Sequence, residues 1–312
     1  MLDRRTGDVR HRRFTDLPGL VAPGDLVVVN DTRVIAARLL ARRAGGGAAE
    51  VLLVAREGDG TWRALVRPGA RIRPGARLAL DGGDGVAVLA ALPGGQRRVR
   101  LEGPGGDVAF IARHGRVPLP PYIAREPGEM DRERYQTVYA ADPGSVAAPT
   151  AGLHFTPAVL AALEARGAAV ARLTLHVGPG TFRPVTADDP AHHLMDEEAY
   201  TLPAETARRV ADTRARGAAV WAVGTTATRT LEACAAPGGT VRAGAGRTSL
   251  FILPGFAFRV VDHLLTNFHL PRSTLLMLVS AFAGRERVLE AYREAVRERY
   301  RFYSYGDAML IL

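Results

Sequence analysis

The sequence predicts an α/β protein of two domains, in which a small all-β, barrel-like domain is inserted into a large mixed α/β domain. Between residues 50 and 101, short apolar runs alternate with glycine and proline, which is typical of antiparallel strands joined by turns. Beyond residue 150, strand-like and helix-like runs alternate, which indicates a parallel or mixed sheet covered by helices. The proline-dense residues 117–122 separate these two patterns, because such a segment suits neither a helix nor a central strand.

These patterns place the large domain at residues 1–47 and 114–312 and the small β domain at residues 48–113. We expect the three glycines at 45–47 to act as a hinge between them. The first strand is expected at 26–29, because an apolar run lies there between turn residues. The strands expected in the small domain are 51–54, 62–66, 77–80, 86–89 and 98–101.

The second half begins with an expected helix over 156–166, which Thr156 caps, Pro157 opens and Gly167 ends. The same signals predict the remaining elements. The expected strands are 170–175, 218–223 and 250–253, and the expected helices are 203–216, 228–235 and 286–300.

Composition excludes several chemistries. All 41 basic residues are arginine, so a Schiff-base lysine and a Walker A loop are ruled out. The single cysteine, Cys234, excludes an intramolecular disulfide and a cysteine-rich zinc site. Neither a signal peptide nor an apolar run of membrane-spanning length is visible, so we expect a cytoplasmic protein without a membrane partner. The net charge of +9 suits phosphate recognition, although an arginine-rich composition is also what a GC-rich genome produces.

Polar segments follow several predicted strands, which is where open α/β sheets bind ligands. Asp31 and Arg33 lie in the first such segment, with a local Asx turn as the equally weighted alternative. His154 precedes a helix start, a position that suits an anion, although a half-buried structural histidine is the alternative. His176 leads into a loop with two glycines, which is weak evidence for a phosphate loop.

Two further segments carry Thr225, Thr226 and Arg229 at a helix start, and Asp262 with His269 between apolar runs. The threonines and Arg229 suit an anionic or ribose group, whereas a capping box in which Glu232 pairs with Arg229 is the structural alternative. A histidine beside a carboxylate such as Asp262 transfers protons near neutral pH.

The last polar segments lie near residue 192 and at the C-terminus. Residues 188–198 hold several acidic groups with His192 and His193, but their spacing favours a solvated loop over a metal site. At residues 300–309 aromatic side chains alternate with an arginine, which suits stacking on a nucleobase or packing in the core.

In order along the chain, these segments resemble one family, the S-adenosylmethionine:tRNA ribosyltransferase-isomerases (QueA) of queuosine synthesis. The resemblance covers nearly the whole chain and rests on several stretches. They are Asn-Asp-Thr-Arg at 30–33, Tyr-Gln-Thr-Val-Tyr at 135–139, Gly-Ser-Val-Ala-Ala-Pro-Thr-Ala-Gly-Leu-His-Phe-Thr at 144–156, His-Val-Gly-Pro-Gly-Thr-Phe at 176–182, Thr-Asn-Phe-His-Leu-Pro at 266–271 and Tyr-Ser-Tyr-Gly-Asp-Ala-Met at 303–309.

The resemblance implies the same two-domain fold and a reaction. The ribosyl part of S-adenosylmethionine, a co-substrate, is rearranged to an epoxycyclopentane and attached to 7-aminomethyl-7-deazaguanine at the wobble position of a tRNA with a GUN anticodon. Adenine and methionine leave, and no prosthetic group or metal is implied. We expect a monomer.

The resemblance also indicates which side chains take part. The ribose carbon beside a sulfonium is acidic, so the reaction needs a base, and the pool for proton transfer is His154, His176, His269, Asp31, Asp262 and Asp307. The methionine carboxylate, ribose and phosphates would be held by Arg33, Thr225, Thr226, Arg229 and Asn267, and a base would stack on Tyr303 and Tyr305.

The chain departs from the family in two places. Members usually carry a leading segment before the region of Leu2 and Asp3, so we expect that an edge of the large domain is missing or that the start codon is misassigned. Residues 193–198 read His-Leu-Met-Asp-Glu-Glu where members commonly have His-x-Met-His-Ser-Glu. The alternatives to the enzyme are therefore a catalytically impaired relative that still binds tRNA, and a transferase acting on another small molecule.

Overall fold

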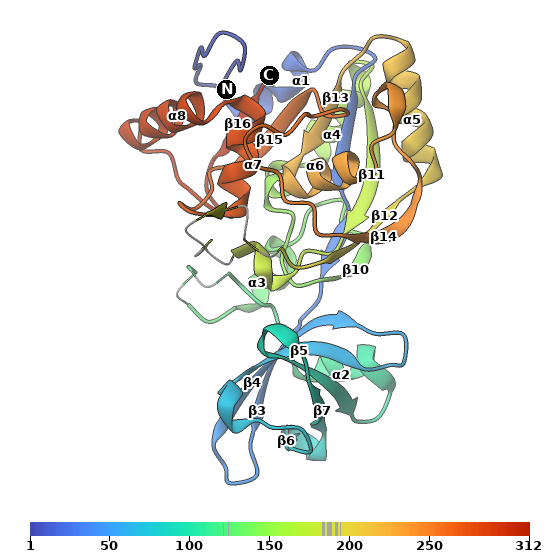
Figure 1. The fold of residues 1–312 in the computed structure, drawn as a ribbon, viewed down its shortest axis with the longest axis vertical. Coiled ribbons are helices and arrows are strands. Elements are labelled where there is room, and N and C mark those ends of the chain that lie inside the picture. The colour runs from blue at the N-terminus through green and yellow to red at the C-terminus, as the bar shows by residue number, and fades with distance from the viewer. Residues whose placement is uncertain (121, 124, 183–184, 186–188, 191–192, 194) are drawn as a thin grey trace. The chain divides into compact units, whose positions relative to one another are not determined.

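The computed structural model describes residues 1–120, 122–123, 125–182, 185, 189–190, 193 and 195–312, which divide into two compact units (Figure 1). Unit 1 comprises Met1–Thr32, Gln136–Asp142 and Ala148–Leu312, and unit 2 comprises Arg33–Tyr135 and Pro143–Ala147.

A hairpin explains why this division differs from the predicted boundaries at residues 47 and 114. Strand β3 (Arg38–Arg42) pairs with β4 (Ala48–Arg56), so both strands belong to unit 2. Residues 45–47 form the turn between them, where the Arg43 amide donates to the Gly47 carbonyl over 2.8 Å. The prediction of a hinge at the three glycines is therefore wrong.

Unit 1 is built on a seven-stranded sheet of order β14-β12-β11-β1-β13-β15-β16. The central strands β11, β1, β13 and β15 are parallel, and the outer strands pair antiparallel. The predicted mixed α/β sheet is thus confirmed. The strand bounds are β1 (Leu26–Asn30), β11 (Ala169–Leu175), β12 (Glu198–Leu202), β13 (Val220–Val223), β14 (Gly244–Thr248), β15 (His263–Asn267) and β16 (Ala308–Ile311).

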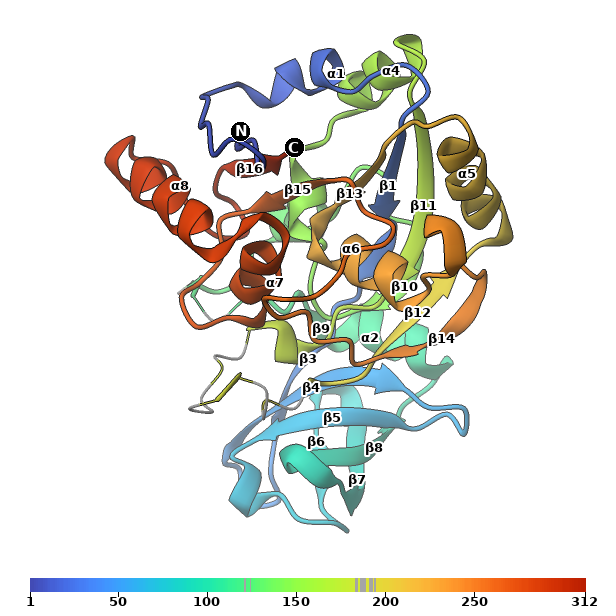
Figure 2. The same cartoon turned by 45° about the horizontal axis from the view of Figure 1, so that its top comes forward.

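Both faces of this sheet are covered, because successive side chains of a strand point to opposite sides. In β1, Leu26 and Val28 pack in one core with residues of α5, α6, α7 and α8, whereas Val27 and Val29 pack in another with residues of α1 and α4. Figure 2 shows α1 and α4 side by side, apart from α6 and α7. The helix bounds are α1 (Leu17–Leu20), α4 (Pro157–Ala165), α5 (Ala204–Ala215), α6 (Gly224–Ala233), α7 (Thr274–Ala283) and α8 (Arg285–Arg297).

Unit 2 is a six-stranded antiparallel barrel, as predicted. The pairing runs β3-β4-β5-β8-β7-β6 and closes because β6 also pairs with β3. Alternate side chains such as Val51, Leu53 and Ala64 fill its interior. Its other elements are β5 (Trp62–Arg67), β6 (Arg77–Ala79), β7 (Gly85–Ala91), β8 (Gln96–Glu102), α2 (Gly106–His114), β9 (Gly115–Arg116) and α3 (Glu129–Arg134), and a separate two-stranded sheet pairs β2 (Thr32–Val34) with β10 (Asp142–Ser145).

Two expectations in unit 1 need correction. Residues 250–253 do not form a strand; the Leu250 carbonyl instead accepts a hydrogen bond from Arg229 Nε, and Ile252 packs into the core as irregular chain. Helix α6 begins at Gly224 rather than at residue 228, because a glycine with φ of +87° allows the chain to turn directly from β13 into the helix.

Candidate active site

The carboxyl ends of β1, β11, β13 and β15 meet at one edge of the large sheet, because these four strands are parallel. Each is followed by polar residues that the sequence singled out, including Asp31, His176, Thr225 and His269. An edge of this kind is where open α/β sheets bind their ligands. The four segments form two polar groups within unit 1.

The first group joins the ends of β1 and β11. Asp31 accepts a hydrogen bond from Thr174 Oγ1 over 2.7 Å, and burial raises the pKa of this carboxyl. The Thr32 hydroxyl lies 2.8 Å from His176 Nδ1, and Asp142 lies 4.0 Å from the other ring nitrogen. Burial lowers the pKa of His176, so its imidazole is neutral at pH 7 and can accept a proton.

The second group surrounds a small cavity of about 40 Å³ beyond β13 and β15. His269 lines it, with Nε2 2.7 Å from the Thr266 hydroxyl, and full burial lowers the pKa of His269 to about 4. Thr225, Thr226 and Asn267 line the same cavity. The structure therefore brings together four of the predicted residues in one polar space.

His154 connects this cavity to a larger one. Its Nε2 lies 3.3 Å from Asn267 Nδ2, while its ring also lines a cavity of about 450 Å³. The Phe14 ring stacks on the imidazole at 5.3 Å between centroids. Burial lowers the pKa of His154, and the charge of Asp307 opposes this shift, so the imidazole is neutral yet has a carboxylate near it.

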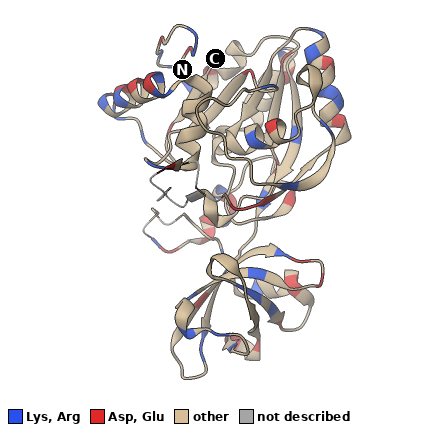
Figure 3. Cartoon of the chain, in the orientation of Figure 1, with Lys and Arg blue, Asp and Glu red and all other residues tan. Residues whose placement is uncertain are grey.

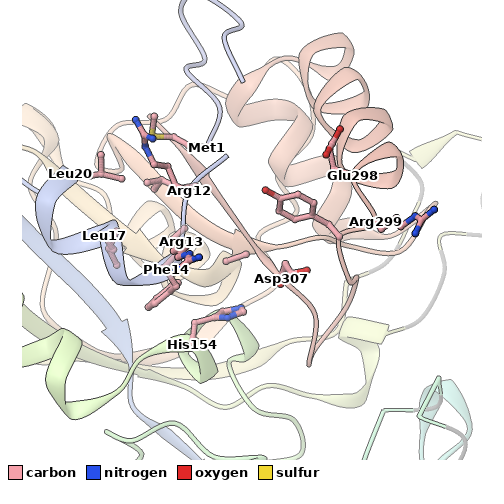
Figure 4. Close-up of a pocket in the computed structure, with 14 residues that line it drawn as sticks. Met1, Arg12, Arg13, Phe14, Leu17, Leu20, His154, Glu298, Arg299 and Asp307 are labelled. Atoms are coloured by element: carbon pink, nitrogen blue, oxygen red, sulfur yellow. The ribbon is translucent and has the colours of Figure 1, made fainter. Parts of the chain in front are cut away.

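The larger cavity combines an apolar floor with polar groups. In Figure 4, Arg13, Phe14 and Asp307 gather around His154, whereas Arg299 extends away from them. Asp307 is held in place because its Oδ2 accepts from the Arg301 amide over 2.7 Å. The apolar lining comes from Met1, Leu17, Leu20, Leu265, Ala308 and Leu310.

Several predicted site residues lie elsewhere. Asp262 precedes β15 and bonds Arg214 Nη1 over 2.8 Å, whereas His269 follows the carboxyl end of the same strand. The strand of five residues separates them by about 16 Å, so Asp262 is not a carboxylate beside His269. Arg33 is exposed on β2, in unit 2.

Arg229 and the two tyrosines differ from what the sequence suggested. Arg229 is buried against Glu198, and Glu232 instead accepts from the backbone amides of residues 259–261, so the alternative in which Glu232 pairs with Arg229 is wrong. Tyr303 adopts a φ of +73° and donates its amide to the Phe268 carbonyl, and the ring of Tyr305 is exposed. Stacking on a base stays a prediction for both.

Sequence reasoning missed two contributors. The Phe14 ring stacks on His154. The sequence signal that could have drawn attention to Phe14 is the run of basic residues at 10–13, which directly precedes it. Glu198 anchors the glycine loop after β11, because its Oε1 accepts from the Gly178 amide over 2.9 Å and from the Thr181 hydroxyl over 3.2 Å. No local pattern marks that role.

Only part of the acidic segment at 188–198 belongs to the residues that the structure describes. Asp188, His192 and Leu194 lie outside the described residues. Among the residues that are described, no three His, Cys, Asp or Glu side chains are grouped as metal ligands would be. Within the same part of the chain, no helix has the length and apolarity needed to cross a membrane.

Comparison with known proteins decides the family. The family model described as "Queuosine biosynthesis protein" matches residues 1–311. This chain belongs to that family. Similar proteins include an S-adenosylmethionine:tRNA ribosyltransferase-isomerase of Anaeromyxobacter sp. (strain Fw109-5), 56% identical over 98% of this chain and 90% of the relative. Its counterpart in Moorella thermoacetica is 53% identical over 100% of this chain and 92% of that protein.

A solved structure is also similar to this chain. The S-adenosylmethionine tRNA ribosyltransferase of Thermotoga maritima is 40% identical to this chain and superposes with a TM-score of 0.54. The match covers 100% of this chain and 90% of that one. The resemblance expected from the sequence motifs is therefore confirmed.

Proposed function

We propose that this chain transfers and isomerises the ribosyl group of S-adenosylmethionine onto 7-aminomethyl-7-deazaguanine at the wobble position of tRNA, giving epoxyqueuosine tRNA, adenine and methionine. The observation that carries the proposal is the family match over residues 1–311, with relatives more than half identical named for this activity. S-adenosylmethionine is the co-substrate. The proposal includes a tRNA with a GUN anticodon, a cytoplasmic location and action as a monomer.

The reaction begins with a proton transfer that His154 is suited to make. The positive sulfur acidifies the neighbouring ribose carbon, and a neutral base close by is needed to take the proton from that carbon. Burial lowers the pKa of His154, so its imidazole is unprotonated at pH 7 and faces the larger cavity. Asp307, whose charge favours the protonated ring, would stabilise the imidazolium once the proton has moved.

The larger cavity has the size and chemistry for a nucleoside. Ligand sites commonly enclose 300–1,000 Å³, and this cavity measures about 450 Å³. The Phe14 ring offers a flat apolar face, the leucines of the lining add apolar contact, and Asp307 offers acceptors to the polar edge of a base. A nucleobase and its sugar would thus lie against His154, where proton transfer is required.

The test is adenine release. We expect free adenine only when the protein receives both S-adenosylmethionine and tRNA that carries the aminomethyl-deazaguanine base. Salt-sensitive tRNA binding without adenine release would support a tRNA-binding relative instead of the enzyme. Weak, salt-independent tRNA binding would contradict any role on tRNA, because phosphate contacts release counterions.

A further inference from the structure

We infer that the small cavity at the start of α6 binds the zwitterionic amino-acid end of S-adenosylmethionine, and binds free methionine as the departing product. The inference rests on the proposed function for the identity of the ligand. The cavity itself, lined by Thr226, Asn267 and their neighbours, belongs to unit 1.

Two buried residues that line this cavity each carry a polar atom without a hydrogen-bond partner in the described part of the chain. Among the described residues, Thr226 Oγ1 and Asn267 Oδ1 are fully enclosed and make no hydrogen bond, and their side chains are 7% and 2% exposed. Both residues line the cavity. Because an unsatisfied buried donor or acceptor costs free energy, two such atoms on residues that line one cavity point to a polar occupant.

The first turn of α6 supplies the complement to a carboxylate. The helix has ten residues, no side chain caps its start, and Gly224, Thr225 and Thr226 all line the cavity. The first amides of a helix have no acceptor within it, and the helix dipole is positive at that end. A carboxylate would therefore accept from these amides and from the Thr226 hydroxyl.

Asn267 supplies the complement to an ammonium. Its Nδ2 donates to the Tyr303 carbonyl over 2.9 Å, so the amide orientation is fixed and Oδ1 is left as an acceptor. Among the residues that the structure describes, no ionised side chain lines the cavity, since the one titratable residue of that lining, His269, is neutral at pH 7. A headgroup with one positive and one negative charge suits this environment better than a simple anion does.

Volume and position limit the occupant to a headgroup. About 40 Å³ exceeds the 10–15 Å³ that one water requires, but it is too small for a ribose or a base. Asn267 also contacts His154, which lines the larger cavity. A ligand anchored here by its amino acid would extend its sulfonium toward His154, the base of the proposed reaction.

Calorimetry with methionine, without tRNA, tests the site directly. Thr226→Val keeps the shape and removes the unpartnered hydroxyl, so we expect methionine affinity to fall about tenfold. The KM for S-adenosylmethionine should rise by a similar factor, with kcat nearly unchanged. The matched control is Thr230→Val on the same helix, because that hydroxyl already bonds the Thr226 carbonyl over 3.0 Å; it should leave both values as in the wild type.

The wild-type protein provides a second test that needs no variant. L-methioninol lacks the carboxylate and should bind much more weakly than methionine. Equal binding of the two compounds, or unchanged methionine binding by a folded Thr226→Val protein, would overturn the inference. Thr226-dependent methionine binding without any adenine release would instead contradict the proposed function and leave the headgroup site standing.

Discussion

Replacing Glu198 by Gln should destabilise unit 1 strongly. Glu198 and Arg229 form an ion pair in which each side chain is only 4% exposed. Glu198 also holds the glycine loop through the Gly178 amide, and Arg229 Nε donates to the Leu250 carbonyl over 3.0 Å. The substitution preserves shape and removes the charge opposite the guanidinium.

The expected magnitude follows from burial. Removing one partner of a buried ion pair leaves an uncompensated charge in the core and typically costs about 3–5 kcal/mol. Glutamine still accepts from the Gly178 amide, so we expect Glu198→Gln to lower the free energy of unfolding by about 3 kcal/mol, the lower end of that range. That is a large share of the roughly 5–15 kcal/mol by which proteins of this kind are stable.

Urea unfolding followed by tryptophan fluorescence measures the effect. The control is Glu205→Gln, which removes a salt bridge between side chains 63% and 43% exposed and should cost less than about 0.5 kcal/mol. The double variant Glu198→Met with Arg229→Met should recover most of the loss, because no buried charge remains. If Glu198→Gln unfolds at the same urea concentration as the control, the reasoning about the buried pair is wrong.

Three further predictions test other parts of the structure. His154→Asn should lower the rate of single-turnover adenine release by about 10²–10⁴-fold. The control His263→Asn, at the amino end of β15, should keep a rate close to that of the wild type. Equal losses in the two variants would remove His154 as the proton carrier. Because burial lowers the pKa of His269 to about 4, the folded state resists protonation, so acid should reduce the free energy of unfolding between pH 6.5 and 4. His269 should contribute about 3 kcal/mol of that loss. His269→Gln should remove this share, whereas the exposed His11→Gln should not; an identical acid profile for both variants would refute the assignment. Asp25→Asn should cost about 2 kcal/mol in urea unfolding, because that buried carboxylate accepts from three N–H donors, and a loss below 0.5 kcal/mol would contradict it.

Local signals explain how much of the fold was predictable. The valine run of β1 and the capped helix α4 follow from apolar patterning and from Thr156, whose hydroxyl accepts from the Val159 amide as expected. The barrel strands follow from regular turn spacing. The prediction of a strand at residues 250–253 was wrong, because a short apolar run looks the same in sequence whether it pairs in a sheet or packs as irregular chain against Arg229.

The candidate site was predictable only in part, because its contacts join distant segments. His154, Asn267 and His269 were identified by residue type, and the structure adds that His154 and Asn267 lie 3.3 Å apart across 113 residues. The role of Glu198 depends on a partner 31 residues away. Asp262 was chosen because it is close to His269 in sequence. The extended strand between the two residues places them at opposite ends of β15.

The most direct test of the account is the stoichiometry of one single-turnover reaction. Excess protein, S-adenosylmethionine and tRNA bearing the aminomethyl-deazaguanine base are mixed, and adenine and modified nucleoside are quantified together by mass spectrometry. We expect one adenine for each epoxyqueuosine formed, with both products lost together in His154→Asn. Adenine released without modified tRNA, or full conversion by His154→Asn, would contradict it.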